Sequence, residues 1–421
     1  MADIDADKIL HDLKIMLSGR SLEEKSLGIK NVLYITLLLL QFHDDEVPTL
    51  IRERDFISYS EKDSTSCLLD SYEKTSEGNY RLANTKRQKD LVRFFQDNQR
   101  IGVPEVIIAI EEPEAHLHPI LQRLVFRDVV FQSAHSILLT THSTHVASVS
   151  PVEHMVHILQ VNKNESTIRT YDQLELSDQD KLDIERYLDV SRGEVYFGKG
   201  VILVEGIAEQ YLIPKFAELI GLPLDKNGVV VCSVNSTNFS PYSAFLTRMS
   251  IPHVVLTDGD FYYEDSNGER IFNILRSPTD TRKFGYLGVE TASNILSSRG
   301  ITVDQSVPFE SSRLLAEKYD VFLGEYTFET DIFLKSIASP EAIASIVRTY
   351  SEVSLGGSRQ KANFEKQLIA GEATKCLAKI EAVGIGKGRF AQRLANTCVV
   401  GNAPDYALNA IRAILAVQKT K

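Results

Sequence analysis

The stretch VILVEGIAEQYLIPKFAELIG, from Val201 to Gly221, decides the fold of the C-terminal half of the chain. It begins as an apolar run that ends in a carboxylate and continues with apolar side chains at helical spacing. Two more apolar runs, VVVCSV (229–234) and HVVLTD (253–258), enclose a second helical segment, SPYSAFLTRMS (240–250). This strand and helix order predicts an α/β fold with a parallel sheet, whose ligands are expected beyond the carboxyl ends of the strands.

Acidic residues follow these strands where they end. LVEGIAE places one carboxylate at the end of the first strand and another one helical turn later on the same face, TDGD follows the third strand, and FETD comes later. The candidate metal ligands are Glu205, Glu209, Asp258, Asp260, Glu329 and Asp331. Carboxylates gathered at one sheet edge repel one another unless cations lie between them, and hard oxygen ligands favour Mg²⁺ or Mn²⁺. TDGD alone also fits a surface turn, but beside VEGxxE it predicts a site for two ions, which could cleave a phosphodiester bond.

The segment KGRFAQRLA begins a late helix and carries two cations, Lys387 and Arg389. A lysine near the metals could neutralise charge on the scissile phosphate, as cations do in other phosphoryl transfers. The alternative is a solvated lysine in a Gly-rich turn. We predict Lys387 as a catalytic residue, with Arg389 as the next candidate.

A second set of motifs lies in the N-terminal half. VIIAIEEPEAHLHP (106–119) is an apolar strand that ends in two carboxylates, and SILLTTHSTHVAS (136–148) is another strand followed by a histidine. This resembles the Walker B arrangement, in which Glu111 helps to hold Mg²⁺, Glu112 orients the attacking water and His142 senses the γ-phosphate. The alternative is a buried strand with two solvated acids.

The sequence KSLGIKN (25–31) resembles the signature of ATP-binding-cassette (ABC) ATPases, whose Ser26 and Gly28 would reach a partner's nucleotide across a dimer. His116 and His118 lie on the loop where ABC ATPases make dimer contacts, so we do not expect them to bind metal. No GxxxxGK[ST] phosphate loop occurs in the chain. We therefore expect ATP to bind only if a missing lobe is supplied, and this chain alone not to hydrolyse it.

Composition limits the class of protein. At roughly 100 to 200 residues per domain, 421 residues suffice for two or three domains. The cysteines Cys67, Cys232, Cys376 and Cys398 form no CxxC pair, which fits a reducing cytoplasm. The longest apolar run, Val32–Leu40, is too short to cross a bilayer, so no membrane partner is expected. A net charge of −11 does not exclude a nuclease, because a local basic groove can coexist with an acidic remainder.

The combination VEGxxE with DxD resembles the Toprim domain of topoisomerases, primases and several nucleases. The whole order of motifs, from the signature through EEPEAHLHP, THS, LVEGIAE, TDGD, FETD and KGRFA, is similar to the OLD (overcoming lysogenisation defect) family of ATPase-nucleases, which includes the Gabija defence nuclease. The similarity runs from about Ser21 to Leu394. It implies an ABC ATPase head that mediates dimerisation and a Toprim nuclease that cleaves DNA with Mg²⁺ or Mn²⁺, in anti-phage defence. The missing ATPase lobe could lie outside this sequence, a partner chain could supply it, or control by ATP could have been lost.

The same resemblance implies roles for individual residues. Glu205 matches the Toprim glutamate that binds metal and can relay a proton, and Glu209 matches a ligand of the second ion. The DxD ligands, the late acidic pair and the basic residue beside the scissile phosphate match Asp258 and Asp260, Glu329 and Asp331, and Lys387. Phe328 stands where the family commonly has Leu.

The predicted organisation has three regions. Residues 1–165 are expected to hold the C-terminal part of an ABC-type ATPase domain, 166–199 a linker, and 200–421 the Toprim domain with additional helices. Within the first region we expect a helix end at 7–20, a helix at 21–42, a polar surface excursion with one or two helices at 44–100, and a short strand after Pro151.

Two other functions fit parts of the pattern. A primase-like or topoisomerase-like Toprim enzyme is one, although no polymerase or DNA-gate module is evident after residue 300. An ABC-like dimerisation or sensor module with an inactive Toprim site is the other. Retention of all the acids together with Lys387 favours the nuclease.

Overall fold

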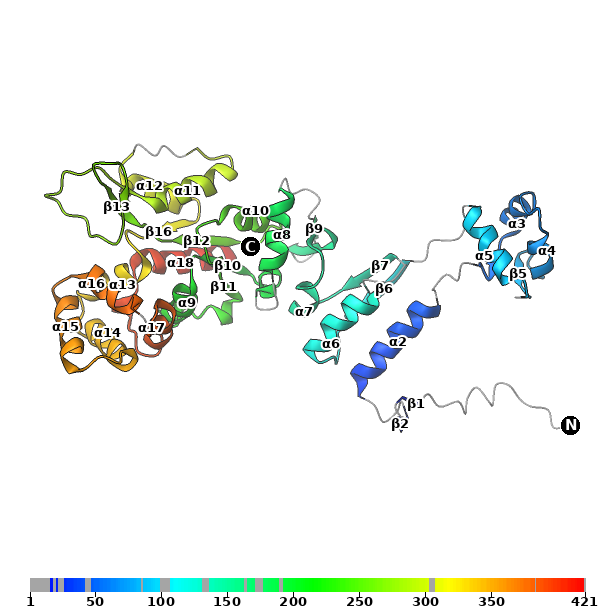
Figure 1. Ribbon diagram of the computed structural model, residues 1–421, viewed down its shortest axis with the longest axis horizontal. Helices are drawn as coiled ribbons and strands as arrows, with labels where there is room; N and C mark the ends of the chain where they lie inside the picture. Colours follow the sequence, from blue (N-terminus) through cyan, green and yellow to red (C-terminus); the bar gives the residue numbers. More distant parts are fainter. Residues whose placement is uncertain are drawn as a thin grey trace. The chain divides into compact units, whose positions relative to one another are not determined.

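A computed structural model of the chain describes residues 16–17, 20–21, 26–41, 47–84, 86–98, 107–130, 136–162, 165–170, 177–188, 192–302, 307–382 and 384–419. The chain divides into two compact units, Met1–Val149 and Ser150–Lys421 (Figure 1). Of the helix end expected at 7–20 and the helix expected at 21–42, residues 7–15, 18–19, 22–25 and 42 lie outside the described residues. Residues 16–17 and 20–21 are extended and not helical, so the expectation of helix is wrong at these positions. Short strands β1 (Met16–Leu17) and β2 (Arg20–Ser21) form an antiparallel pair there.

The first unit contains the parallel strand pair that the apolar runs predicted. Strands β6 (Ile107–Glu111) and β7 (Ser136–Thr140) pair in parallel, with Glu111 opposite Thr140. Helix α2 (Leu27–Gln41) packs its apolar side chains against Ile108. The connections are α6 (Pro119–Leu124), the π-helix η2 (Val125–Val130) and α7 (Thr144–Ala147). These elements confirm the predicted α/β character of this segment.

Residues 47–98 form more structure than the sequence predicted. The elements are β3 (Leu50–Ile51), α3 (Glu53–Ser60), α4 (Cys67–Ser71), β4 (Tyr72–Lys74), β5 (Tyr80–Leu82) and α5 (Gln88–Asp97). The three strands pair in the order β3-β5-β4, and the aromatic residues enclose a separate core. The expectation of a surface excursion with one or two helices is wrong here, because the core side chains are scattered singly among polar ones and give no clear period.

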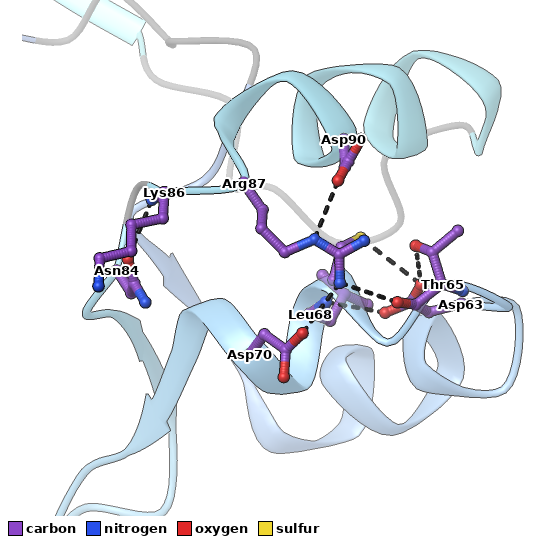
Figure 2. A network of polar contacts seen from close by, with 9 residues as sticks. Asp63, Thr65, Leu68, Asp70, Asn84, Lys86, Arg87 and Asp90 are labelled. Atoms are coloured by element: carbon purple, nitrogen blue, oxygen red, sulfur yellow. Dashed lines mark hydrogen bonds and ion pairs between the residues drawn. The ribbon is translucent and has the colours of Figure 1, made fainter.

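A polar network closes this small subdomain (Figure 2). The Arg87 guanidinium donates to the Thr65 carbonyl and to Asp70 at 2.9 Å each, and to Asp90 at 2.9 Å. It therefore joins the turn before α4, helix α4 itself and the start of α5.

The second unit is built on a four-stranded parallel sheet in the order β11-β10-β12-β16. The strands are β10 (Gly200–Val204), β11 (Val229–Ser233), β12 (His253–Thr257) and β16 (Val321–Leu323). The first three strands and the helices between them, α9 (Ile207–Leu219) and α10 (Ser240–Arg248), confirm the predicted parallel sheet. Strand β16 is too short for the sequence to have indicated it.

Helices enclose this sheet and fill the C-terminal part, as the sequence predicted. Helix α18 (Asp405–Lys419) packs on β10, β12 and β16, and α17 (Lys387–Leu394) packs on α9. The remaining helices are α11 (Leu287–Ser298), α12 (Phe309–Lys318), α13 (Phe328–Ser336), α14 (Pro340–Val353), α15 (Ser358–Ile369) and α16 (Ala373–Glu381), with 3₁₀ turns η6 (Asp225–Asn227) and η7 (Val400–Asn402). One apolar core runs from the sheet into these helices.

A small antiparallel sheet follows Asp260 directly, in the order β14-β13-β15. Its strands are β13 (Phe261–Glu264), β14 (Arg270–Ile271) and β15 (Phe284–Tyr286). Because β13 starts where the TDGD motif ends, this sheet is anchored next to the carboxyl end of β12.

The boundary between the two units differs from the predicted division at residue 165. The strand expected after Pro151 is confirmed as part of a hairpin, β8 (Val156–Asn162) and β9 (Glu165–Thr170). Its His157 Nδ1 lies 3.3 Å from the Met249 carbonyl, and Arg169 Nε donates to Ser250 Oγ at 2.9 Å. These contacts tie the hairpin to the end of α10, so it groups with the second unit.

The segment predicted as a linker is also structured where it is described. Within it lie α8 (Asp178–Tyr187) and η5 (Gly193–Tyr196), while η3 (Val152–His154) lies before the hairpin and ahead of the predicted linker. The Tyr187 ring lies 4.3 Å from that of Tyr242 on α10. All four cysteines are buried and none of them forms a disulfide, and none of the described helices is long and apolar enough to span a bilayer.

The aromatic packing of the C-terminal helices yields a stability prediction. Phe364 is fully buried and stacks on Tyr350 at 3.8 Å between ring centroids. Phe364→Ala leaves a cavity and should lower the free energy of unfolding by about 3–5 kcal/mol in denaturant titrations. Leu355, 98% exposed in the neighbouring loop, is the matched control, and Leu355→Ala should change it by less than about 0.5 kcal/mol. Equal losses in the two variants would contradict this packing.

Candidate metal site

Glu205 is held at the carboxyl end of β10 by the neighbouring strand. Its Oε1 accepts the Asp258 backbone N–H at 2.7 Å and the hydroxyl of Thr257. Its own carbonyl accepts from Ser233 Oγ at 3.1 Å, at the end of β11. The ends of three adjacent strands therefore fix the Glu205 carboxylate. This agrees with the predicted parallel sheet, in which ligands are expected beyond the carboxyl ends of the strands.

The TDGD loop follows β12 and is fixed by very close backbone contacts. A Cβ on Gly259 would lie 2.2 Å from the Gly324 carbonyl oxygen, and a Cβ on Gly288 would lie 2.1 Å from the Asp258 carbonyl oxygen. The Gly259 N–H donates to the Tyr326 carbonyl at 2.9 Å. Asp260 has a φ of 46°, a left-handed conformation that turns its side chain back toward the strand ends. Glycine is therefore required at positions 259 and 288 for the loop to take this shape.

Three carboxylates form the centre of the cluster. Each of Glu205, Asp258 and Asp260 offers an oxygen atom within 4.8 Å of the others. Burial raises the pKa of Asp258 well above its ordinary value, and Glu205 adds to the effect by repulsion. The Asp258 Oδ1 atom is buried and accepts no hydrogen bond from the described residues. A buried carboxylate oxygen without a donor among the described residues suits a positively charged ligand.

Glu209 on α9 and Glu329 on α13 extend the cluster into the protein. Both side chains are almost fully buried. Burial raises the pKa of Glu209 to about 8, and repulsion from Glu329 is the next largest cause. Burial also raises the pKa of Glu329, while Lys387 lowers it. The structure thus brings together most of the predicted ligands.

This donor set fits a divalent cation. All of its ligand atoms are carboxylate oxygens, the type that Mg²⁺ and Mn²⁺ prefer. The raised pKa values and the orphaned Asp258 oxygen indicate charge that the protein alone leaves uncompensated.

Lys387, at the start of α17, is the cation nearest to this cluster among the described residues. Its Nζ lies 3.3 Å from Glu329 Oε2 and 3.3 Å from Glu381 Oε1. Burial alone would lower the pKa of the Lys387 amine, but Glu329 and Glu381 raise it above the ordinary value. Glu381, at the end of α16, was not singled out from the sequence, because no motif contains it. Arg389 lies apart, exposed, with Nη1 donating to the Gly384 carbonyl at 3.3 Å.

Asp331 has a different environment from the other predicted ligands. Its Oδ2 accepts the Glu325 N–H at 3.0 Å, and its Oδ1 accepts the Tyr326 N–H at 3.2 Å. Burial raises the pKa of Asp331 to about 7, although these two N–H groups lower it. Asp331 therefore holds the 324–327 loop next to Gly259, and its carboxylate accepts hydrogen bonds from backbone N–H groups of that loop.

The motifs of the first unit also assemble around strand ends. His142 Nε2 lies 3.8 Å from Glu112 Oε1, next to the point where Glu111 ends β6. Glu114 accepts hydrogen bonds from Thr141 Oγ1 at 2.6 Å and from the His142 N–H at 3.0 Å. It was not among the residues predicted from the sequence. These contacts bring the two carboxylates of the Walker B-like strand and the histidine to one edge.

The signature-like segment packs on the same loop. Ser26 precedes α2, where its carbonyl accepts the Lys30 N–H at 3.2 Å. A Cβ on Gly28 would lie 2.4 Å from the His116 carbonyl oxygen. His118 Nδ1 accepts the Ile120 N–H at 3.4 Å as a helix cap, and neither His116 nor His118 belongs to a metal-type cluster among the described residues.

Comparisons with known proteins match both units. Residues 196–260 match the family described as overcoming lysogenization defect protein-like, TOPRIM domain, and residues 88–147 match an AAA ATPase domain. An uncharacterized protein YbjD of Escherichia coli is 29% identical over 154 residues, 37% of this chain and 28% of its own length. The endonuclease GajA of Bacillus cereus is 26% identical over 156 residues, 37% of this chain and 26% of its own.

A solved structure of the C-terminal region of the Burkholderia pseudomallei OLD protein is 30% identical, over 53% of this chain and 99% of that region, with a TM-score of 0.41. The relationship to this region rests on the 30% sequence identity over almost its whole length and not on the superposition. The chain spans only 26 to 35% of the length of the curated relatives that it matches.

The raised pKa of Glu209 predicts a pH-dependent stability without metal. In the unfolded chain this carboxyl ionises near its ordinary pKa of 4.5, whereas in the folded protein it keeps its proton up to about pH 8. Between these two pH values the folded protein holds one more proton than the unfolded chain. The contribution of Glu209 to the free energy of unfolding is therefore fully present below pH 4.5 and is lost as the pH rises through about 8. Glu209→Gln cannot ionise and should flatten this part of a plot of Tm against pH, measured in EDTA. An unchanged slope in the variant would show that Glu209 is ionised in the folded protein.

Proposed function

This chain belongs to the OLD family, and we propose that it cleaves DNA by hydrolysing phosphodiester bonds at its carboxylate cluster with the help of two Mg²⁺ or Mn²⁺ ions. The observation that carries the proposal is the convergence of Glu205, Asp258 and Asp260 within 4.8 Å. Such a cluster at the carboxyl edge of a parallel sheet is poorly suited to binding an anion unless cations neutralise it.

The residues would divide the work as follows. Glu205, Asp258 and Asp260 would hold one cation, and Glu209 with Glu329 would hold a second. When bound, the cations would activate a water and stabilise the charge on the leaving oxygen. Glu205 is fixed by Thr257 and the Asp258 N–H, so its free oxygen has a defined direction. Asp331 would act indirectly, because it positions the loop under Gly259.

Lys387 would stabilise negative charge that develops on the scissile phosphate. Its amine already lies 3.3 Å from Glu329, so it borders the place where the second cation would bind. Glu381 holds the same amine from the other side and supports it as a positioning residue.

The first unit would serve regulation and assembly. We propose that Ser26, Gly28, Glu111, Glu112 and His142 take part in an ATP site completed by a phosphate loop on another lobe or chain. A homodimer or larger homo-oligomer through this unit, action in the cytoplasm and a role in anti-phage defence belong to the same proposal. It is supported by the match to an AAA ATPase domain and by the contact between Glu112 and His142.

Conversion of supercoiled plasmid tests the proposed reaction. The chain should nick or linearise plasmid in Mg²⁺ or Mn²⁺ and not in EDTA, with Ca²⁺ as a third metal condition. Glu205→Ala and Asp258→Ala should abolish cleavage and leave the fold intact, because relieving carboxylate repulsion should not destabilise the metal-free protein. Glu365→Ala, an exposed acid on α15, is the matched control and should cut at the parental rate. Cleavage by both site variants at the parental rate would refute the assignment.

Substitutions at Lys387 test its role separately from metal binding. Lys387→Ala should lower the cleavage rate by about 10²–10³-fold, because a preorganised charge at the reacting group is lost. Lys387→Arg should restore little, since the guanidinium is larger and planar. Glu381→Gln should reduce the rate by less than Lys387→Ala, and Mn²⁺ binding measured by calorimetry should survive in all of these variants. If Lys387→Ala cleaved DNA at the parental rate, the catalytic role proposed for Lys387 would be wrong, and Arg389 would be the next residue to test.

A further inference from the structure

The small antiparallel sheet beside the carboxylate cluster carries an arginine stacked on an aromatic ring. The Arg276 guanidinium carbon lies 4.7 Å from the centroid of the Phe284 ring, at the start of β15. Arg276 is exposed, and Phe284 is 42% exposed. Stacking fixes the plane of a guanidinium. The Arg276 guanidinium also lies beside the Tyr286 hydroxyl, where burial raises the pKa of Tyr286 and Arg276 lowers it.

Backbone contacts tie Arg276 to the TDGD loop through a single residue. The Arg276 N–H donates to the Tyr326 hydroxyl at 3.1 Å, and the Tyr326 carbonyl accepts from the Gly259 N–H at 2.9 Å. Phe261, the residue after Asp260, packs against the Tyr326 ring at 5.9 Å. One tyrosine therefore separates the Arg276 backbone from the loop that carries Asp258 and Asp260.

The other cations of this sheet are already neutralised. Arg282 stacks on Tyr263 at 4.3 Å, but its Nε also lies 3.0 Å from Asp280 Oδ1 and 3.1 Å from Oδ2. Arg270 pairs with Glu290, and Lys283 pairs with Glu264. Among the described residues, no acidic side chain forms an ion pair with Arg276. Its charge is thus the one in this sheet that remains available to an anion from solution.

Arg276 does not act on the reacting centre itself. The cation that lowers the pKa of Asp260 is Lys387, against the raising effect of burial. The Arg276 backbone is instead connected through Tyr326 to the loop that carries the cluster. An anion that touches both places must be extended and carry regularly spaced negative charges, which describes a nucleic-acid strand.

We propose that Arg276, held flat on Phe284, binds a backbone phosphate of the DNA strand next to the phosphate that is cut. This inference rests on the proposed function for the identity of its ligand. The planar guanidinium can donate two hydrogen bonds to one phosphate, which fixes the register of the strand across the carboxylate cluster. Phe284 supports the contact by preventing the side chain from rotating away.

Binding of DNA can be measured without cleavage. A fluorescein-labelled DNA duplex and the corresponding single strand would be titrated with the full chain in EDTA and in Ca²⁺, followed by anisotropy at several salt concentrations. Arg276→Ala should weaken binding by roughly threefold to tenfold near 0.1 M salt and reduce the slope of log K against log salt by about 1. Phe284→Ala should weaken binding in the same direction, and Arg276→Lys should recover the salt slope but only part of the affinity.

Arg282→Ala is the matched control, because Arg282 is also stacked in this sheet but is paired with Asp280. Its affinity should equal that of the parent chain, and thermal unfolding would check that each variant is folded. Parental affinity in Arg276→Ala, or an equal loss in Arg282→Ala, would overturn the inference. Absence of plasmid cleavage by the parent chain would count against the proposed reaction alone, since the binding comparison decides the role of Arg276 separately.

Discussion

Repulsion between buried carboxylates at the carboxyl edge of the parallel sheet is the constraint on which the second unit depends. Glu209 and Glu329 are almost fully buried, and Asp258 keeps an oxygen atom without a donor. Such groups are stable only as neutral acids or beside positive charge. Without metal, protonation and the ion pair between Lys387 and Glu329 stabilise these acids, and bound cations would take the place of the protons.

The surrounding structure keeps this unfavourable arrangement from relaxing. Gly259 and Gly288 bring three backbone segments so close that no side chain fits between them. Asp331 holds the loop that supports Gly259, and Thr257 holds Glu205. Preorganisation of this kind is what a hydrolytic site requires, because ligands that are already in place need no rearrangement when the reaction begins. The remainder of the domain supplies the rigidity through its continuous apolar core.

The two units repeat one principle with different consequences. In each, acidic residues follow parallel strands, since the carboxyl ends of such strands collect at one edge. In the first unit Glu112 and His142 are exposed and adjacent. In the second unit the acids are largely buried, and among them Glu329 forms an ion pair with Lys387. The antiparallel sheet that follows Asp260 adds the aromatic and basic side chains that the acidic cluster itself lacks.

The parallel sheet, its helices and the acids at strand ends could be predicted from the sequence, because apolar runs and motif spacing are local properties of the chain. Glu205, Glu209, Asp258 and Asp260 were accessible in this way. The folded arrangement was needed to see that Glu381 and Glu329 both contact Lys387, that Asp331 accepts from a backbone loop, and that Arg282, unlike Arg276, forms an ion pair with an acid among the described residues. The same is true of the core within residues 47–98 and of the hairpin that joins the second unit. These features depend on which side chains from distant segments come into contact. Neither hydrophobic periodicity nor the order of motifs in the sequence predicts such contacts.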